Sequence, residues 1–130
     1  MNKILIVDDD SVVLGFLKTF FEKKGDIALI AKSGEEALAL VDQERPTIAL
    51  LDVVMPGMSG LELLKKIRAK MPDMVVAMIT GLHDEHLARE AASLGAYSYV
   101  TKPFDLYYLE LVVSTGLMMC AGEEKSKEKL

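Results

Sequence analysis

Residues 3–10 read KILIVDDD, a short and mostly apolar run that ends in three consecutive aspartates. Residues 47–52, TIALLD, repeat this pattern, because an apolar run again ends in an acid, Asp52. Short, nearly continuous apolar runs are typical of strands that are buried on both faces of a parallel sheet. The two stretches therefore predict buried parallel strands whose carboxyl ends carry acids.

Outward from these stretches, apolar runs alternate with segments of helical periodicity along the chain. The apolar runs are Lys3–Val7, Ile27–Ala31, 47–51, 74–79 and 97–101. The helical segments are 11–24, Gly34–Glu44, 61–71, 87–94 and a last one from 106 onward. Five strand–helix units with short connections predict an α/β fold, a three-layer, doubly wound, five-stranded parallel sheet with helices on both faces.

The size and composition of the chain fit one domain. Its 130 residues are enough to bury a substantial core, and 51% of them are hydrophobic. The formal net charge of −5 argues against direct binding of nucleic acid by this domain. We assign residues 1–121 to the domain and residues 122–130, almost all Glu, Lys and Ser, to a charged tail or linker.

The sequence shows none of the features that indicate secretion or a membrane-spanning segment. The single cysteine, Cys120, cannot form an internal disulfide. The first residues do not resemble a signal peptide, and no apolar run approaches the roughly 20 residues that a membrane-spanning helix needs. We therefore expect a cytoplasmic protein.

Four of the five predicted strands carry polar or charged side chains at their carboxyl ends. The residues concerned are Asp8, Asp9, Asp10, Asp52, Thr80 and Lys102. Because ligands bind beyond the carboxyl ends of the strands in open parallel sheets, we expect these side chains to form one site.

The acids of this site suit a metal ion. Asp10 or Ser11 is a good N-cap for the first helix, but capping accounts for only one side chain. Neighbouring carboxylates repel one another unless a cation neutralises them. With Asp52 nearby, the cluster predicts a hard-oxygen site for Mg²⁺. Lys102 is placed to reach into this acidic pocket, where its ammonium pairs with a carboxylate or a phosphoryl oxygen.

These residues together resemble the receiver domains of two-component response regulators, the family of the bacterial chemotaxis regulator. The resemblance covers essentially residues 3–119 and rests on four segments that occur in order at characteristic spacings. They are IVDDDS at 6–11, LLDVVMPGMSG at 50–60, ITG at 79–81 and YVTKPF at 99–104. The resemblance implies a flavodoxin-like (βα)5 fold with strand order 2-1-3-4-5.

The resemblance also implies a role for each site residue. Asp52 takes a phosphoryl group from a phosphohistidine on a sensor histidine kinase or histidine phosphotransfer protein. Asp9, Asp52 and the backbone carbonyl of Val54 ligate Mg²⁺, and Asp8 holds a metal-bound water. Lys102 helps the ion to neutralise charge during the transfer. The domain is then a signalling phosphoacceptor rather than an enzyme, although it catalyses its own phosphorylation and a slow autodephosphorylation.

Two further residues are implied as the switch. Thr80 moves toward the phosphoryl group, and Tyr99 changes between outward and inward rotamers. This two-state element acts on the surface of the fourth helix, fifth strand and fifth helix, where a downstream effector or output domain docks and where a homodimer would form.

Two positions depart from the polar side chains that family members often carry. Val54 and Leu82 lie where such side chains guide water to the acyl phosphate, so apolar groups there predict a long-lived phosphoaspartate. Gly81 is small enough to leave the site open to the histidine of a partner.

Other interpretations remain to be weighed. Asp8 and Asp10 fit the nucleophile motif of a phosphohydrolase of the haloacid dehalogenase type, but this leaves Asp52 without a role and lacks the usual late pair of acids. A phosphorylation-independent docking module of receiver type would usually lose an acid or the lysine. A metal site at His83 and His86 has the required spacing but no further ligand.

Overall fold

The computed structural model describes the backbone of residues 2–128 and the side chains of residues 2–119. Within this part of the chain, five strands alternate with five helices. The strands are β1 (Lys3–Val7), β2 (Ile27–Ala31), β3 (Ile48–Leu51), β4 (Val75–Thr80) and β5 (Ser98–Thr101). The helices are α1 (Ser11–Lys23), α2 (Gly34–Glu44), α3 (Gly60–Lys70), α4 (Glu85–Ser93) and α5 (Leu106–Glu128). The predicted succession of elements is confirmed.

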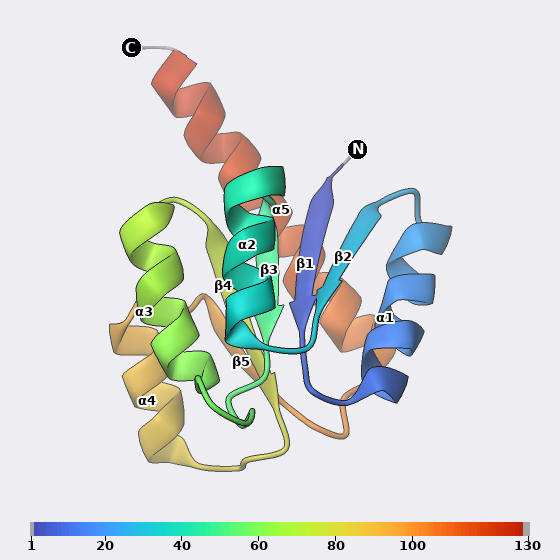
Figure 1. The fold of residues 1–130 in the computed structure, drawn as a ribbon. Helices are drawn as coiled ribbons and strands as arrows, with labels where there is room; N and C mark the ends of the chain where they lie inside the picture. The colour runs from blue at the N-terminus through green and yellow to red at the C-terminus, as the bar shows by residue number, and fades with distance from the viewer. Residues whose placement is uncertain (1, 129–130) are drawn as a thin grey trace.

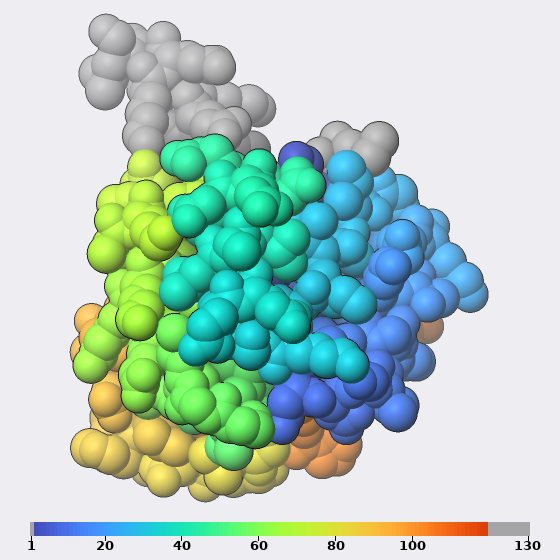
Figure 2. Space-filling view, in the orientation of Figure 1, coloured from blue at the N-terminus to red at the C-terminus, as the bar shows by residue number. Residues whose placement is uncertain are grey.

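The strands form one parallel sheet in the order β2-β1-β3-β4-β5. Helices α2, α3 and α4 pack on one face, and α1 and α5 on the other (Figure 1). The side chains of α2 and α3 cover the sheet on the face seen in Figure 2. The predicted three-layer, flavodoxin-like fold with strand order 2-1-3-4-5 is therefore confirmed.

The two faces of the sheet explain the unbroken apolar runs of the sequence. Successive side chains of a strand point to opposite faces. In β1, Leu5 and Val7 belong to the core under α2 and α3, whereas Ile4 and Ile6 belong to the core under α1 and α5. A strand covered on both faces has no side on which polar side chains would be favoured.

Capping side chains set where four of the helices begin. Each cap has an extended backbone and a side-chain oxygen that accepts a backbone N–H of the first helical turn. These caps are Asp10, Ser33, Ser59 and Asp84. Asp10 is thus the N-cap of α1, which separates its role from those of the other two acids in its run.

The turn after helix α4 is joined to a neighbouring turn by one arginine. Ala91 is the one buried residue of α4. The guanidinium group of Arg68 donates hydrogen bonds to the carbonyl oxygens of Pro72 (3.1 Å), Met74 (2.6 Å) and Gly95 (2.7 Å), and so joins the turn after α4 to the turn after α3. The fork of N–H donors on arginine suits this bridging of several carbonyls.

Helix α5 continues well beyond the edge of the sheet (Figure 1). Its backbone is helical through Glu128, so residues 122–128 of the predicted tail continue the helix. Residues 129–130 lie outside the described residues, and the predicted domain boundary at residue 121 stays a prediction. No helix in the described part of the chain combines the length and apolarity needed to cross a membrane.

Candidate phosphoacceptor site

The site lies at the carboxyl edge of β1, β3, β4 and β5. Asp52 follows β3, and its backbone N–H donates to the carbonyl oxygen of Val7 at 3.0 Å. This bond extends the parallel register of β1 and β3 by one residue and brings Asp52 beside Asp8. On the other side, the N–H of Lys102 donates to the carbonyl oxygen of Thr80 at 2.7 Å. Main-chain bonds therefore set the positions from which the side chains act.

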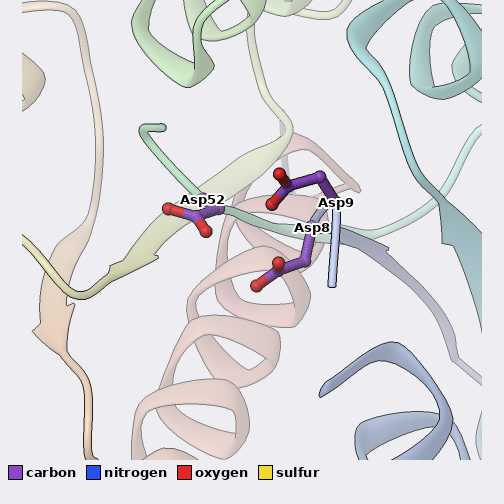
Figure 3. A group of neighbouring side chains, drawn as sticks. All are labelled: Asp8, Asp9 and Asp52. Atoms are coloured by element: carbon purple, nitrogen blue, oxygen red, sulfur yellow. The ribbon is translucent and has the colours of Figure 1, made fainter. Parts of the chain in front are cut away.

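The three acids at this edge differ in their surroundings. Asp8 and Asp52 are only 3% and 8% exposed, whereas Asp9 is exposed. The side chains of all three lie next to one another at the strand ends (Figure 3). One carboxylate oxygen of each lies within 4.8 Å of the others. The predicted grouping of acids from two separate strands is thus present.

Lys102 joins the two buried acids. Its Nζ lies 2.5 Å from Asp8 Oδ2 and 3.2 Å from Asp52 Oδ2. The peptide bond between Lys102 and Pro103 is cis. A second donor reaches Asp52, because the backbone N–H of Val54 donates to Oδ1 at 3.2 Å. Each oxygen of the Asp52 carboxylate therefore has its own hydrogen-bond donor.

Burial and pairing shift the pKa values of this group. Burial raises the pKa of Asp8 above its usual 3.8, although the hydrogen bond from Lys102 acts in the opposite direction. Burial lowers the pKa of Lys102, but the hydrogen bond to Asp8 and the charge of Asp52 outweigh it, and the net pKa lies above 10.5. Lys102 is therefore cationic at neutral pH, while the Asp8 carboxylate carries an unrelieved cost of desolvation.

The donor set fits a hard divalent cation. Three carboxylates face one ammonium, which leaves an excess of negative charge at the strand ends. Asp9 is exposed and can turn toward an ion, and the oxygens come from neighbouring chain segments. Oxygen ligands with room for water are what Mg²⁺ requires.

The residues predicted as the switch surround the loop after β4. Thr80 is fully buried, and its Oγ1 accepts from the N–H of Leu82 at 3.4 Å. The hydroxyl of Tyr99 donates to the carbonyl oxygen of Leu82 at 2.8 Å. Burial raises the pKa of Tyr99, so the hydroxyl remains a donor at neutral pH. Thr80 and Tyr99 thus contact the N–H and the carbonyl oxygen of the same residue.

Two structural features of the site were not predicted from the sequence. A Cβ atom on Gly60 would lie 2.0 Å from the backbone oxygen of Asp52, so only glycine lets α3 begin so close to Asp52. The sequence marks Gly60 only as a break in regular structure. The second feature is His83, whose Nε2 lies 3.2 Å from the carbonyl oxygen of Lys102. Neither His83 nor His86 belongs to a group with metal-binding geometry among the described residues.

The raised pKa of Asp8 leads to a prediction about stability. A raised pKa means that the folded state favours the protonated form, so the ionised carboxylate destabilises the fold at any pH above the raised pKa. In EDTA at pH 7, we expect Asp8→Asn to increase the free energy of unfolding, measured in urea. The difference from wild type should shrink as the pH falls through the raised pKa and then below 3.8, where Asp8 is protonated in both states.

Asp10→Asn is the matched control for this prediction. It removes one charge two positions further along the chain but keeps a good N-cap, so we expect a change within about 0.5 kcal/mol. A lower stability of Asp8→Asn at neutral pH in EDTA would contradict the cost assigned to the buried carboxylate.

A protein-family model described as response regulator receiver domain matches residues 4–114. Sporulation initiation phosphotransferase F of Bacillus subtilis (strain 168) is 38% identical over 105 residues, which cover 81% of this chain and 85% of that protein. A CheY-like response regulator receiver domain protein from Methanospirillum hungatei JF-1 superposes with a TM-score of 0.91 at 32% identity, covering 95% of this chain and 98% of that one.

Other relatives are much longer than this chain. Regulatory protein AtoC of Escherichia coli (strain K12) is 38% identical over 119 residues, which cover 92% of this chain but 26% of AtoC. The match with a cyclic di-GMP phosphodiesterase of Thermotoga maritima covers 30% of that protein. These similarities do not favour the haloacid dehalogenase interpretation. The strand order, the acids at the strand ends and the matched residues lead to one conclusion: this chain belongs to the receiver domains of two-component response regulators.

Proposed function

We propose that Asp52 is the phosphoacceptor of this receiver domain and that its partner presents a phosphohistidine. The observation that carries the proposal is the position of the Lys102 ammonium, which contacts both Asp8 and Asp52 at the carboxyl edge of the sheet. A buried carboxylate next to a fixed cation and an excess of acids is suited to receive an anionic group. Perturbed, partly buried charges of this kind are common at functional sites.

In the proposed reaction a carboxylate oxygen of Asp52 attacks the phosphorus atom of the phosphohistidine. An O–P bond forms as the P–N bond breaks, and the histidine imidazole leaves with the bonding electron pair. The N–H of Val54 fixes the orientation of the Asp52 carboxylate during the attack. Lys102 then moves its ammonium from Asp52 to an oxygen of the new phosphoryl group, which keeps the local charge balanced.

Asp9, Asp52 and the backbone carbonyl of Val54 are proposed to hold Mg²⁺, with Asp8 acting through a bound water. The excess of carboxylate charge at the strand ends supports this assignment. When bound, the ion supplies neutralisation of charge on the phosphoryl oxygens. The chain itself supplies the alignment, because the register of β1 and β3 places the donors before any ion binds.

Thr80 and Tyr99 are proposed to convert the phosphorylated state into a change of surface. The hydroxyl of Thr80 would donate a hydrogen bond to the phosphoryl group, and Leu82 would lose its contact with Thr80 Oγ1. Tyr99 would then no longer be held at the Leu82 carbonyl and would change rotamer. The surface of α4, β5 and α5 differs between the two states, and a downstream effector or output domain would read it.

The proposed partners are a sensor histidine kinase or histidine phosphotransfer protein upstream and an effector downstream. A cytoplasmic location is part of this proposal, since one cysteine leaves nothing that depends on an oxidising compartment. The net charge of −5 supports binding to proteins rather than to nucleic acid by this domain.

The decisive experiment is incubation with acetyl phosphate and Mg²⁺, followed by mass spectrometry of the intact protein. We expect one added phosphoryl group in the wild type, none in Asp52→Asn, and less in the presence of EDTA. A modification that survives Asp52→Asn and is lost only in Asp8→Asn would instead support the hydrolase mechanism. The absence of any modification in the wild type would support the phosphorylation-independent docking module.

The side chains of Val54 and Leu82 lead to a prediction about the lifetime of the phosphate. They are 55% and 38% exposed and carry no group that could orient a water molecule. We expect the phosphoaspartate to be lost slowly, and Val54→Asn with Leu82→Glu to speed its loss by about tenfold or more, because positioned polar groups assist proton transfer. Loss is followed by mass after removal of acetyl phosphate.

Phe16→Gln serves as the control for this lifetime. It also replaces an exposed apolar side chain by a polar one, but on α1. We expect it to leave the lifetime unchanged. Rapid loss of phosphate from the wild type in Mg²⁺, without any phosphatase, would refute the prediction.

A homodimer through α5 is the last element of the proposal. Tyr107, Leu111 and Met118 are each more than half exposed, and their spacings of four and seven residues place them on one stripe of the helix. Two copies of a helix with such a stripe can pack against each other as in a coiled coil. A second copy of this chain therefore fits the stripe.

We expect Leu111→Glu to weaken self-association by at least about tenfold, because it places two like charges in the dimer contact. Analytical ultracentrifugation of the beryllofluoride-bound protein measures this association. Val12→Glu, which changes an exposed apolar residue of α1 in the same way, is the control. Equal dimer dissociation constants for the two variants would rule out the α5 stripe as the contact.

A further inference from the structure

All three polar groups of Lys102 are engaged. Its ammonium contacts Asp8 and Asp52, and its N–H donates to the carbonyl oxygen of Thr80. Its own carbonyl oxygen lies 3.2 Å from Nε2 of His83. Since a carbonyl oxygen can only accept, this contact requires a hydrogen on Nε2 of the imidazole. His83 is therefore bonded to the main chain of the residue that supplies the cation of the site.

We propose that His83 is a positioning residue of the switch. Its Nε2–H donates to the Lys102 carbonyl and holds the loop between β4 and α4, residues 81–84, in the unphosphorylated position. The inference rests on the proposed function, because it assigns a regulatory role at the same site. It concerns the side chain of His83, which has no role in the phosphoryl transfer itself.

Few other contacts hold this loop. Leu82 accepts the Tyr99 hydroxyl at 2.8 Å, while its own N–H makes only a long contact of 3.4 Å with Thr80 Oγ1. The far end of α4 is fixed by Arg68, and Ala91 is the one buried residue of that helix. Leu87 anchors the first turn of α4 in the core, and Asp84 caps the helix. The loop before this cap is joined to the rest of the domain by side-chain hydrogen bonds from Tyr99 and His83.

The imidazole has room to leave its position. A surface cavity of about 310 Å³ lies at the start of α4. It is lined by His83, Asp84, Glu85, Ala88, Tyr99 and Thr101. When Thr80 moves toward a phosphoryl group, the residues after it must follow, and the bond from His83 to Lys102 breaks. The bond thus stabilises the unphosphorylated position and opposes activation.

The first test measures how readily the active state forms. Beryllofluoride with Mg²⁺ is titrated into the protein, and the amide NMR signals of Thr80 and Leu82 report half-saturation. We expect His83→Ala to lower the beryllofluoride concentration at half-saturation by about two- to tenfold, the range expected for loss of one neutral hydrogen bond. His83→Gln retains an N–H donor of similar reach and should restore the wild-type value. His86→Ala, three residues further on, should leave that value unchanged.

The second test does not depend on phosphorylation. In the Asp52→Asn background, we expect His83→Ala to speed hydrogen exchange of the amides of residues 82–84 by about two- to tenfold, with His83→Gln close to the parent. Long-range ¹H–¹⁵N NMR should show a proton on Nε2 of His83. If Asp52 were not the acceptor, the beryllofluoride response would disappear from every variant, whereas this exchange effect would persist.

Three results would overturn the role of His83. The first is an Nε2 of His83 without a proton in the unphosphorylated protein, and the second is equal exchange rates in His83→Ala and its parent. The third is a beryllofluoride concentration at half-saturation that is unchanged or higher in His83→Ala. His83→Ala could also lower the beryllofluoride concentration at half-saturation without His83→Gln restoring it. This result would contradict the proposed role too, because the hydrogen bond would then not be the cause.

Discussion

The contact of the Lys102 ammonium with Asp8 and Asp52 is the interaction on which the site depends. Two carboxylates that are almost fully buried cannot both remain ionised next to each other without a compensating cation. Lys102 supplies one positive charge, and the exposed Asp9 adds a third negative one. The negative charge at this edge of the sheet is therefore only partly neutralised by Lys102. This condition favours the binding of a divalent cation.

The sheet makes this contact possible because main-chain hydrogen bonds continue to the residues directly after the strands. The Asp52 N–H bonds to Val7, and the Lys102 N–H bonds to Thr80, so the register of the ladder sets the distances between side chains. Burial on both faces leaves the strands no freedom to slip, since a shift by one residue would exchange the two cores. The close start of α3 completes the frame, because Gly60 lies directly against the backbone of Asp52.

The loop after β4, on the other side of the site, is held by a different kind of contact. Helix α3 and the strand ends are bound by main-chain hydrogen bonds and apolar packing, whereas the loop after β4 is held by the side chains of Tyr99 and His83. Each side-chain hydrogen bond at the surface contributes little to the free energy of folding, so it can be exchanged without disturbing the packing of the core. Arg68 keeps the far end of α4 in place. In the proposed switch, a displacement of Thr80 would therefore affect the start of α4 more than its far end.

The sequence alone determined the succession of elements, the class of fold and the strand ends that carry the chemistry. These properties depend on local periodicity, on apolar runs and on the connection rules of parallel sheets. The family, with the strand order it implies, could be inferred from short segments such as 50–60 and 99–104. The different roles of Asp8 and Asp9 came from the family resemblance alone, because the two residues are chemically identical neighbours.

Only the tertiary structure distinguished a buried acid, an exposed acid and a helix cap among the three consecutive aspartates. It also decided which atoms Lys102 reaches, why position 60 must be a glycine, and that His83 meets the main chain of Lys102 rather than a metal ion. Each of these outcomes depends on distances between segments that lie far apart in the chain. Packing of the helices on the sheet sets those distances, and burial, which shifts the pKa of Asp8, exists only once that packing has formed.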